Sequence, residues 1–183
     1  MNTAGATPVD RLYQEASAIV EQLGKATETS LQISAGDNFR KALLLAAASH
    51  FESRICHLLV DFVRERSGNS TLVESFVKNR AISRQYHTLF NWNENNANHF
   101  FGFFGTSFKT AMSQRIRDSE QLGEAIKAFM AIGSERNRLV HLDYACFPLE
   151  KTLDEIYSLF QKGLFFLDHL PKALRECDGC SKD

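Results

Sequence analysis

Residues 136–141, Arg-Asn-Arg-Leu-Val-His, hold two guanidiniums, an amide and an imidazole within six positions. His141 brings an imidazole, the side chain type most often used to take up and release a proton in catalysis. Arg136 keeps its charge at any working pH and can hold two phosphate oxygens at once. Residues of these types suit acid–base chemistry beside a phosphate, provided that the fold brings them together.

The spacing within this stretch decides which side chains share a helix face. Arg136 and His141 are five positions apart, so on a regular helix they point about 140° away from each other. Asn137 and Arg138 lie four and three residues before His141, and both are therefore its neighbours. Arg136 can join His141 in two ways. Either the helix frays at residues 142–143, or two copies of the chain meet about a twofold axis and pool their motifs.

Glu52 is an acidic residue on an apolar helix face. At 100° per residue it falls in the middle of an apolar arc, formed by Leu45, Ala48, Cys56 and Leu59. A buried carboxylate is costly unless a cation or hydrogen-bond donors satisfy it. We therefore expect an arginine from elsewhere in the fold to pair with Glu52, either as a structural ion pair or in support of an active site. A position at the rim of the apolar face is the remaining alternative.

The elements that must position these residues are helices. Apolar residues recur at helical spacing from Asp10 to about Gly24 and from Phe39 to about Arg66, where residues 36–38 offer an N-cap. Ser119 is the expected N-cap of the helix that precedes the motif, and residues 133–134 are expected to kink or restart that helix. Further helices or helical pieces are expected at residues 72–77, 86–90, 107–117 and 148–171, with a loop at 91–98.

The chain shows no alternating strand pattern and no internal repeat. We therefore expect an all-α fold, a helical bundle of four to five main helices with short extra helices. A chain of 183 residues is long enough for one ordinary domain and too short for two. The expected organisation is a flexible leader at 1–9, a single domain at 10–175 and a flexible tail at 176–183.

Composition narrows the possible partners. A formal net charge of −1 excludes a globally basic nucleic-acid binder, so binding of RNA or DNA requires a local basic patch. No signal peptide and no apolar stretch of membrane-span length is visible, which predicts a cytoplasmic protein without a membrane partner. The CxxC pair of Cys177 and Cys180 lies in a polar stretch and lacks a second ligand pair. A solvated tail is therefore expected there, rather than a metal or redox site.

Arginine, four residues and then histidine, closing a helix of an all-α domain, resembles the HEPN superfamily, whose signature is Arg, four to six residues, then His. Asn137 occupies the position after the arginine, which many members fill with a polar residue. Residues 46–55 are similar to the second-helix pattern of the RiboL-PSP-type branch, with Glu52 as its acidic residue. Residues 103–108 resemble the mid-chain aromatic-glycine segment of that branch, and the resemblance covers roughly residues 37–170.

The resemblance implies a metal-independent endoribonuclease that acts on RNA as a homodimer, without a cofactor, with its composite active site at the dimer interface. In that scheme His141 is the general acid or base, Arg136 stabilises the phosphate, and Asn137 orients the imidazole or donates to phosphate. Arg138 tracks the RNA backbone, and Glu52 holds one of the arginines in place. Many members are toxins or defence effectors, which implies an antitoxin or defence-system partner protein.

Other interpretations stay open at this point. The motif can be a solvated helix end at which the helix dipole stabilises a positively charged histidine. It can also be part of a non-catalytic HEPN module that binds RNA, a nucleotide or a partner protein. The polar side of the second helix offers a metal site at His50, His57 and Asp61, although Arg54 in the same stripe would repel a cation. Alternatively His50 and Arg54 face the cleft across the dimer and bind RNA there.

Overall fold

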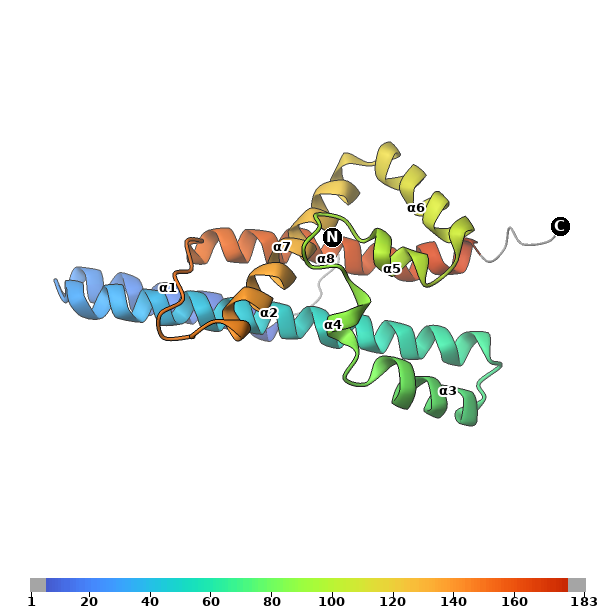
Figure 1. The fold of residues 1–183 in the computed structure, drawn as a ribbon. Helices are drawn as coiled ribbons and strands as arrows, with labels where there is room; N and C mark the ends of the chain where they lie inside the picture. The colour runs from blue at the N-terminus through green and yellow to red at the C-terminus, as the bar shows by residue number, and fades with distance from the viewer. Residues whose placement is uncertain (1–5, 178–183) are drawn as a thin grey trace.

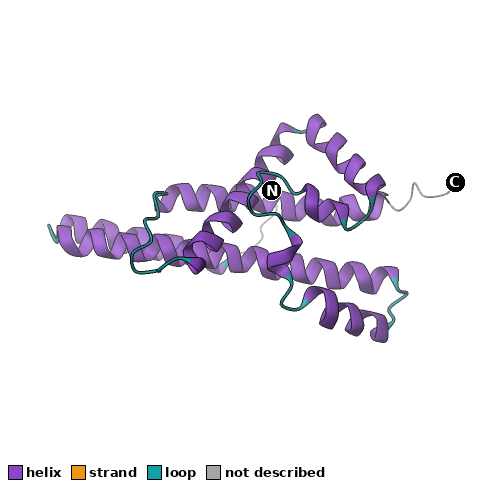
Figure 2. Ribbon diagram, in the orientation of Figure 1, coloured by secondary structure: helices purple, strands orange, loops and turns teal. Residues whose placement is uncertain are grey.

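The computed structural model describes residues 6–177, and within them the chain is helical without a strand, which confirms the all-α prediction (Figure 2). The helices are α1 Pro8–Lys25, α2 Thr29–Arg66, α3 Thr71–Val77, α4 Tyr86–Leu89, α5 Asn98–Gly102, α6 Thr106–Asp118, α7 Glu120–His141 and α8 Leu153–Cys177, with a π-helical turn η1 Lys78–Ile82 after α3.

The long helix α2 is the axis of the molecule (Figure 1). It packs against α1, α7 and α8, while α3 folds back along its C-terminal half. Phe51 of α2 stacks on Phe129 of α7 and on Phe160 of α8, with ring centroids 5.0 and 5.5 Å apart. These three rings join the three core helices, so the position of α7 and its terminal motif is fixed by aromatic packing.

Both ends of the expected domain differ slightly from the helix bounds. Helix α1 begins at Pro8 because Thr7 and Asp10 form a capping box in front of it, and Val9 is already in the core. Residues 176 and 177 belong to α8. The rest of the expected leader and tail, residues 1–5 and 178–183 including Cys180, lies outside the described residues.

The expected start of the second helix was wrong by ten residues. Helix α2 begins at Thr29 and runs through Gly36 without interruption, so Asp37 is a helix-interior residue rather than part of an N-cap. The Asp37 carboxylate instead binds the Nζ of Lys41 at 2.8 Å, and this ammonium also donates to the backbone carbonyl of Tyr144 at 3.0 Å. Lys41 is buried, so it ties α2 to the segment that directly follows the motif.

Replacing Lys41 with methionine is expected to lower the free energy of unfolding by about 1–3 kcal/mol, because the Tyr144 carbonyl and Asp37 lose their partner. The stem of the side chain keeps its volume in the core. Urea denaturation measures the loss. Lys127→Met is the matched control, because the ion pair between Lys127 and Glu124 is exposed and is worth less than about 1 kcal/mol. Equal stability of the two variants would contradict this role of Lys41.

The last helix also begins later than expected. Pro148 lies in the connection after α7, and α8 starts at Leu153, where Thr152 and Glu155 bond each other's backbone N–H in a capping box. Helix α8 then continues through Pro171 to Cys177. Proline thus marked neither end of this helix, because tertiary packing overrode its local preference.

Helix α2 is long and apolar enough to cross a membrane by length and composition alone, contrary to the expectation from the sequence. The central helix of a helical bundle meets the same two criteria. In the structure one side of α2 is buried against α1, α7 and α8.

Candidate active site

The motif occupies the last turns of α7, the helix that Ser119 caps as predicted by accepting a hydrogen bond from the backbone of Leu122. The expected restart at residues 133–134 was wrong, because α7 continues without a break to His141. Gly133 has a different purpose. A Cβ atom at this position would lie 1.9 Å from Cζ3 of Trp92, so the glycine makes room for the indole ring.

Four of the predicted site residues line one pocket of about 410 Å³. The pocket lies where the end of α7 meets the middle of α2 and the segment around α4. Its lining consists of Glu52, Arg84, Tyr86, His87, Arg136, Asn137, Val140 and His141.

Arg136 and His141 border this pocket in a single chain, although they diverge about the helix axis and the helix does not fray before His141. The pocket lies at the end of α7, and the side chains of both residues belong to its lining. Nη1 of Arg136 donates to Oδ1 of Asn137 at 3.1 Å, which fixes both side chains at the pocket wall. Arg136 and Asn137 are half-buried and His141 is exposed, so the imidazole is open to a ligand.

Glu52 is half-buried and lines the pocket together with Arg136. The arginine partner expected for Glu52 is not bonded to it, since within residues 6–177 no hydrogen bond or ion pair joins Glu52 to another side chain. Solvent in the pocket reaches the carboxylate, and a rim position therefore satisfies it without a direct ion pair.

Three lining residues escaped the sequence analysis: Arg84, Tyr86 and His87. They come from the turn before α4 and from α4 itself, about fifty residues ahead of the motif. Arg84 has a positive φ of 62°, an uncommon conformation for a residue with a side chain that is often found at functional sites. The dipeptides Arg84-Gln85 and Tyr86-His87 carry basic and aromatic side chains, but nothing in their spacing connects them to residues 136–141.

Tyr86 supplies a proton donor to the pocket wall. Burial holds the pKa of its hydroxyl far above the ordinary value, nearby Glu52 and Cys56 raise it further, and Arg136 opposes them. The phenol therefore stays protonated at any physiological pH. Tyr86 has no hydrogen-bond partner within the described residues, so its hydroxyl can donate to a ligand.

The pocket lining carries more positive than negative charge. The lining contains two guanidiniums, those of Arg84 and Arg136, and one carboxylate, that of Glu52. The imidazoles of His87 and His141 can add further positive charge. Together with the uncharged donors of Tyr86 and Asn137, this set suits an anion with several oxygens, such as a phosphate group.

Arg138 is held on the other side of the helix end. Its Nη1 contacts both carboxylate oxygens of Glu135 at 3.2 and 3.3 Å, and its guanidinium lies over the ring of Phe147, 5.3 Å from the centroid. Lys151 also approaches Glu135, with Nζ 3.6 Å from the carboxylate. Arg138 does not line the pocket of Arg136, but it lines a neighbouring one of about 400 Å³.

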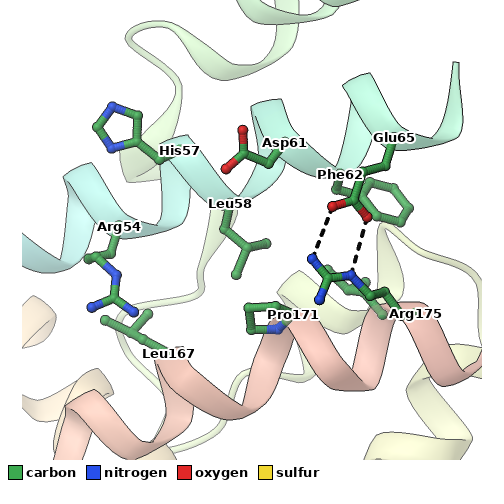
Figure 3. A pocket seen from close by; sticks show the side chains of 10 residues that line it. Arg54, His57, Leu58, Asp61, Phe62, Glu65, Leu167, Pro171 and Arg175 are labelled. Atoms are coloured by element: carbon green, nitrogen blue, oxygen red, sulfur yellow. Dashed lines mark hydrogen bonds and ion pairs between the residues drawn. The ribbon is translucent and has the colours of Figure 1, made fainter. Parts of the chain in front are cut away.

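His50 and Arg54 lie on the side of α2 that faces α8. Arg54 donates to Asp168 at 2.8 Å and borders a separate pocket of about 230 Å³ between the two helices (Figure 3). His50 packs edge-on against Phe160, with ring centroids 5.3 Å apart. Neither residue borders the pockets at the motif, so an RNA-binding role for this pair depends on a second chain and stays a prediction.

Burial lowers the pKa of His50 below its ordinary value of 6.5; Arg54 lowers it further and Asp10 opposes this. The unfolded chain therefore takes up a proton at a higher pH than the folded chain. The stability that neutral His50 contributes is complete above about pH 6.5 and is lost as the pH falls through the folded pKa.

His50→Gln is accordingly expected to weaken the fall in unfolding free energy between roughly pH 7.5 and 5.5, as measured by urea denaturation. A part of the fall should survive, because burial also lowers the pKa of His169. The exposed His57 offers the control His57→Gln, which should leave the fall as it is. A fall that is the same in His50→Gln as in the unchanged protein would contradict the prediction.

The described residues offer no cluster of donors for the alternative of a metal site. Residues 6–177 contain no group of three or more His, Cys, Asp or Glu side chains arranged to hold a metal ion. His57, one of the three candidate ligands, lies 3.4 Å from the hydroxyl of Ser53 through its Nδ1, and Cys177 in the last turn of α8 is a free thiol.

A family model described as RiboL-PSP-HEPN matches residues 10–176 of the chain. The match spans α1 to α8, apart from the first two residues of α1 and the last residue of α8, and it includes every residue of the pocket at Arg136 and His141. No curated protein and no solved structure shows significant similarity to the chain.

Proposed function

The chain belongs to the RiboL-PSP-HEPN family, and on this basis we propose that it is a metal-independent endoribonuclease. His141 acts as general acid or base in this proposal, and Arg136 stabilises the phosphate at which the RNA strand is cut. HEPN-type domains are often ribonucleases. A toxin or defence role in the cytoplasm, controlled by a partner protein, belongs to the same proposal.

One observation carries the proposal: Arg136, Asn137 and His141 line one pocket together with Glu52, Arg84 and Tyr86. This arrangement combines a group that can transfer protons with two guanidiniums and neutral donors. Cleavage of RNA at a phosphate needs both kinds of group, since a proton must move while negative charge builds on the phosphate oxygens.

RNA carries its own nucleophile, which is why a metal-bound water is unnecessary. The 2′-hydroxyl loses its proton to a base and attacks the adjacent phosphorus, and the bond from phosphorus to the 5′-oxygen breaks. The leaving 5′-oxygen receives a proton, so the products are a 2′,3′-cyclic phosphate and a 5′-hydroxyl. His141 exchanges a proton with one of these two oxygens, and the guanidiniums of Arg136 and Arg84 bind the phosphate oxygens.

Asn137 and Glu52 act on the reacting groups indirectly. Oδ1 of Asn137 accepts a hydrogen bond from Arg136, so the amide orients the guanidinium and leaves its own N–H groups free for phosphate. Glu52 adds negative charge to a pocket that is otherwise cationic, which in this proposal keeps Arg136 turned inward.

We further propose that two copies of the chain cover this cleft in a homodimer. Val140, Leu142 and Tyr144, which lie within three positions of His141 in the sequence, have exposed apolar side chains, with 45%, 57% and 43% of their surface accessible. Apolar side chains that cluster on a surface favour contact with another protein surface. A twofold axis near His141 would place two motifs in one cleft.

The decisive experiment incubates single-stranded RNA with the purified protein in EDTA and determines the chemical ends of the products. We expect cleavage with 2′,3′-cyclic phosphate and 5′-hydroxyl ends. Tight binding of RNA without any cleavage would instead favour the non-catalytic HEPN module.

A further inference from the structure

Two neighbouring pockets, rather than one, lie at the end of α7. The second pocket, of about 400 Å³, lies between α7 and the loop 91–97, and it shares only Asn137 and His141 with the first. Its volume is in the range of sites for small organic groups, about 300–1,000 Å³. A ligand at the histidine therefore has a second space directly beside it.

The two pockets differ in chemistry. The first contains Arg84, Arg136 and Glu52, whereas the second is lined by aromatic rings, amides and a hydroxyl and contains no carboxylate. Its one guanidinium, that of Arg138, is occupied by Glu135 and by the ring of Phe147. Apart from this paired guanidinium and the shared imidazole of His141, the lining is uncharged and polar with aromatic walls, which suits a flat heterocycle better than a phosphate.

We propose that this second pocket binds a nucleobase of the RNA strand, next to the phosphate held at Arg136 and His141, and gives the enzyme a base preference. The inference rests on the proposed ribonuclease function. A base and its own phosphate are neighbours in a nucleotide, and two pockets that meet at Asn137 and His141 accommodate both.

Several polar groups of the second pocket are free to read a base edge. Within the described residues the side chains of Asn93 and Ser134 have no hydrogen-bond partner, and Asn137 uses only its Oδ1, for Arg136. Amides carry both a donor and an acceptor, the combination that pairs with the edge of a base. The Asn91 amide, by contrast, is engaged with Glu94 and with the backbone of Asn93, which fixes the loop.

The wall of the pocket is rigid. Trp92 packs against Phe90, with ring centroids 5.0 Å apart, and its Nε1 donates to the carbonyl of His87 at 3.0 Å. Gly133 admits the indole against α7, so the loop and the helix that carries Ser134 and Asn137 are fixed to each other. Fixed donors discriminate between bases, because a wrong base leaves them without a partner.

Binding of uncleavable RNA tests this inference separately from catalysis. Four 2′-O-methyl oligonucleotides, each built from one base, lack the nucleophile. The protein is titrated into each of them with fluorescence anisotropy as the readout. We expect the protein to prefer one base by about tenfold. Asn93→Ala and Ser134→Ala should each reduce this preference to less than about threefold, mainly by weakening the best oligonucleotide.

Asn95→Ala is the matched control, because Asn95 is an exposed asparagine of the same loop that lines neither pocket. This variant should keep the full preference.

Equal affinity for all four oligonucleotides, or an unchanged preference in both pocket variants, would overturn the inference even if ordinary RNA is cleaved. A preference that depends on Asn93 and Ser134 supports it even if no RNA is cleaved, a result that would remove the proposed catalysis alone. Displacement of the oligonucleotide by an equal concentration of the free nucleoside monophosphate would overturn the assignment to an RNA strand.

Discussion

RNA cleavage in EDTA is expected to fall by about a hundred- to ten-thousandfold when His141 is replaced by alanine, because the proton transfer loses its acid or base. Arg136→Ala is expected to lower the rate by about a hundred- to thousandfold, the usual effect of removing a donor to a developing negative charge. Both side chains line the same pocket, and His141 is exposed, so its removal should leave the fold intact.

Initial rates of cleavage of a labelled single-stranded RNA measure both effects, and thermal unfolding shows that the variants are folded. His99→Ala and Arg117→Ala are the matched controls, since both residues are exposed and line neither pocket at the motif. They should keep the full rate. Cleavage that survives unchanged in His141→Ala or in Arg136→Ala would remove these residues from the mechanism.

Mixing the two inactive variants tests the proposed dimer cleft with the same assay. If Arg136 of one chain works with His141 of the other, a mixed dimer contains one complete site, and part of the activity returns. Each variant alone stays inactive. No recovery in a mixture that forms mixed dimers would overturn the shared cleft, while the ribonuclease assignment would stand.

The second large effect is expected from Gly133→Ala. A methyl group at this position would collide with the Trp92 ring, at 1.9 Å from Cζ3 and 2.3 Å from Cε3. The indole is almost fully buried among Phe90 and Phe129 and cannot simply turn away. Overpacking of this kind costs about 1–3 kcal/mol, so urea denaturation should show a clear loss of stability.

Gly123 in the same helix provides a control with the opposite expectation. A Cβ atom there would meet only Cγ2 of Ile116 at 3.6 Å, which is an ordinary contact. Alanine favours a helix interior over glycine by up to about 1 kcal/mol, so Gly123→Ala should be neutral or stabilising. If Gly133→Ala were as stable as Gly123→Ala, the close packing of Trp92 on α7 would be contradicted.

Local patterns were sufficient for the type of most elements. Helical periodicity predicted α1, the main part of α2 and the helix that ends in the motif, because the side chains of a helix repeat along the sequence itself. The N-cap at Ser119 and the loop rich in asparagine before α5 are equally local features. The predictions that failed, at residues 36–38, 133–134 and 148, all took a glycine or a proline as the sign of a helix boundary.

Contacts between distant residues explain the first two of these failures. Asp37 lies inside α2 with Lys41, which anchors the backbone at Tyr144, and Gly133 admits a tryptophan that lies 41 positions earlier in the chain. Neither partner can be recognised from the residues next to the glycine or aspartate. Tertiary packing therefore overrode the local preference in each case.

Residue patterns were enough to predict an all-α domain of the HEPN type in which Arg136, Asn137 and His141 close a helix. The residues around this motif could be identified only from the packing of the helices. Glu52, Arg84 and Tyr86 come from α2 and from the segment at α4, and they meet the motif because α2 and α7 pack through Phe51 and Phe129. Helical periodicity fixes the direction of a side chain about its own helix, whereas a pocket depends on how separate helices cross.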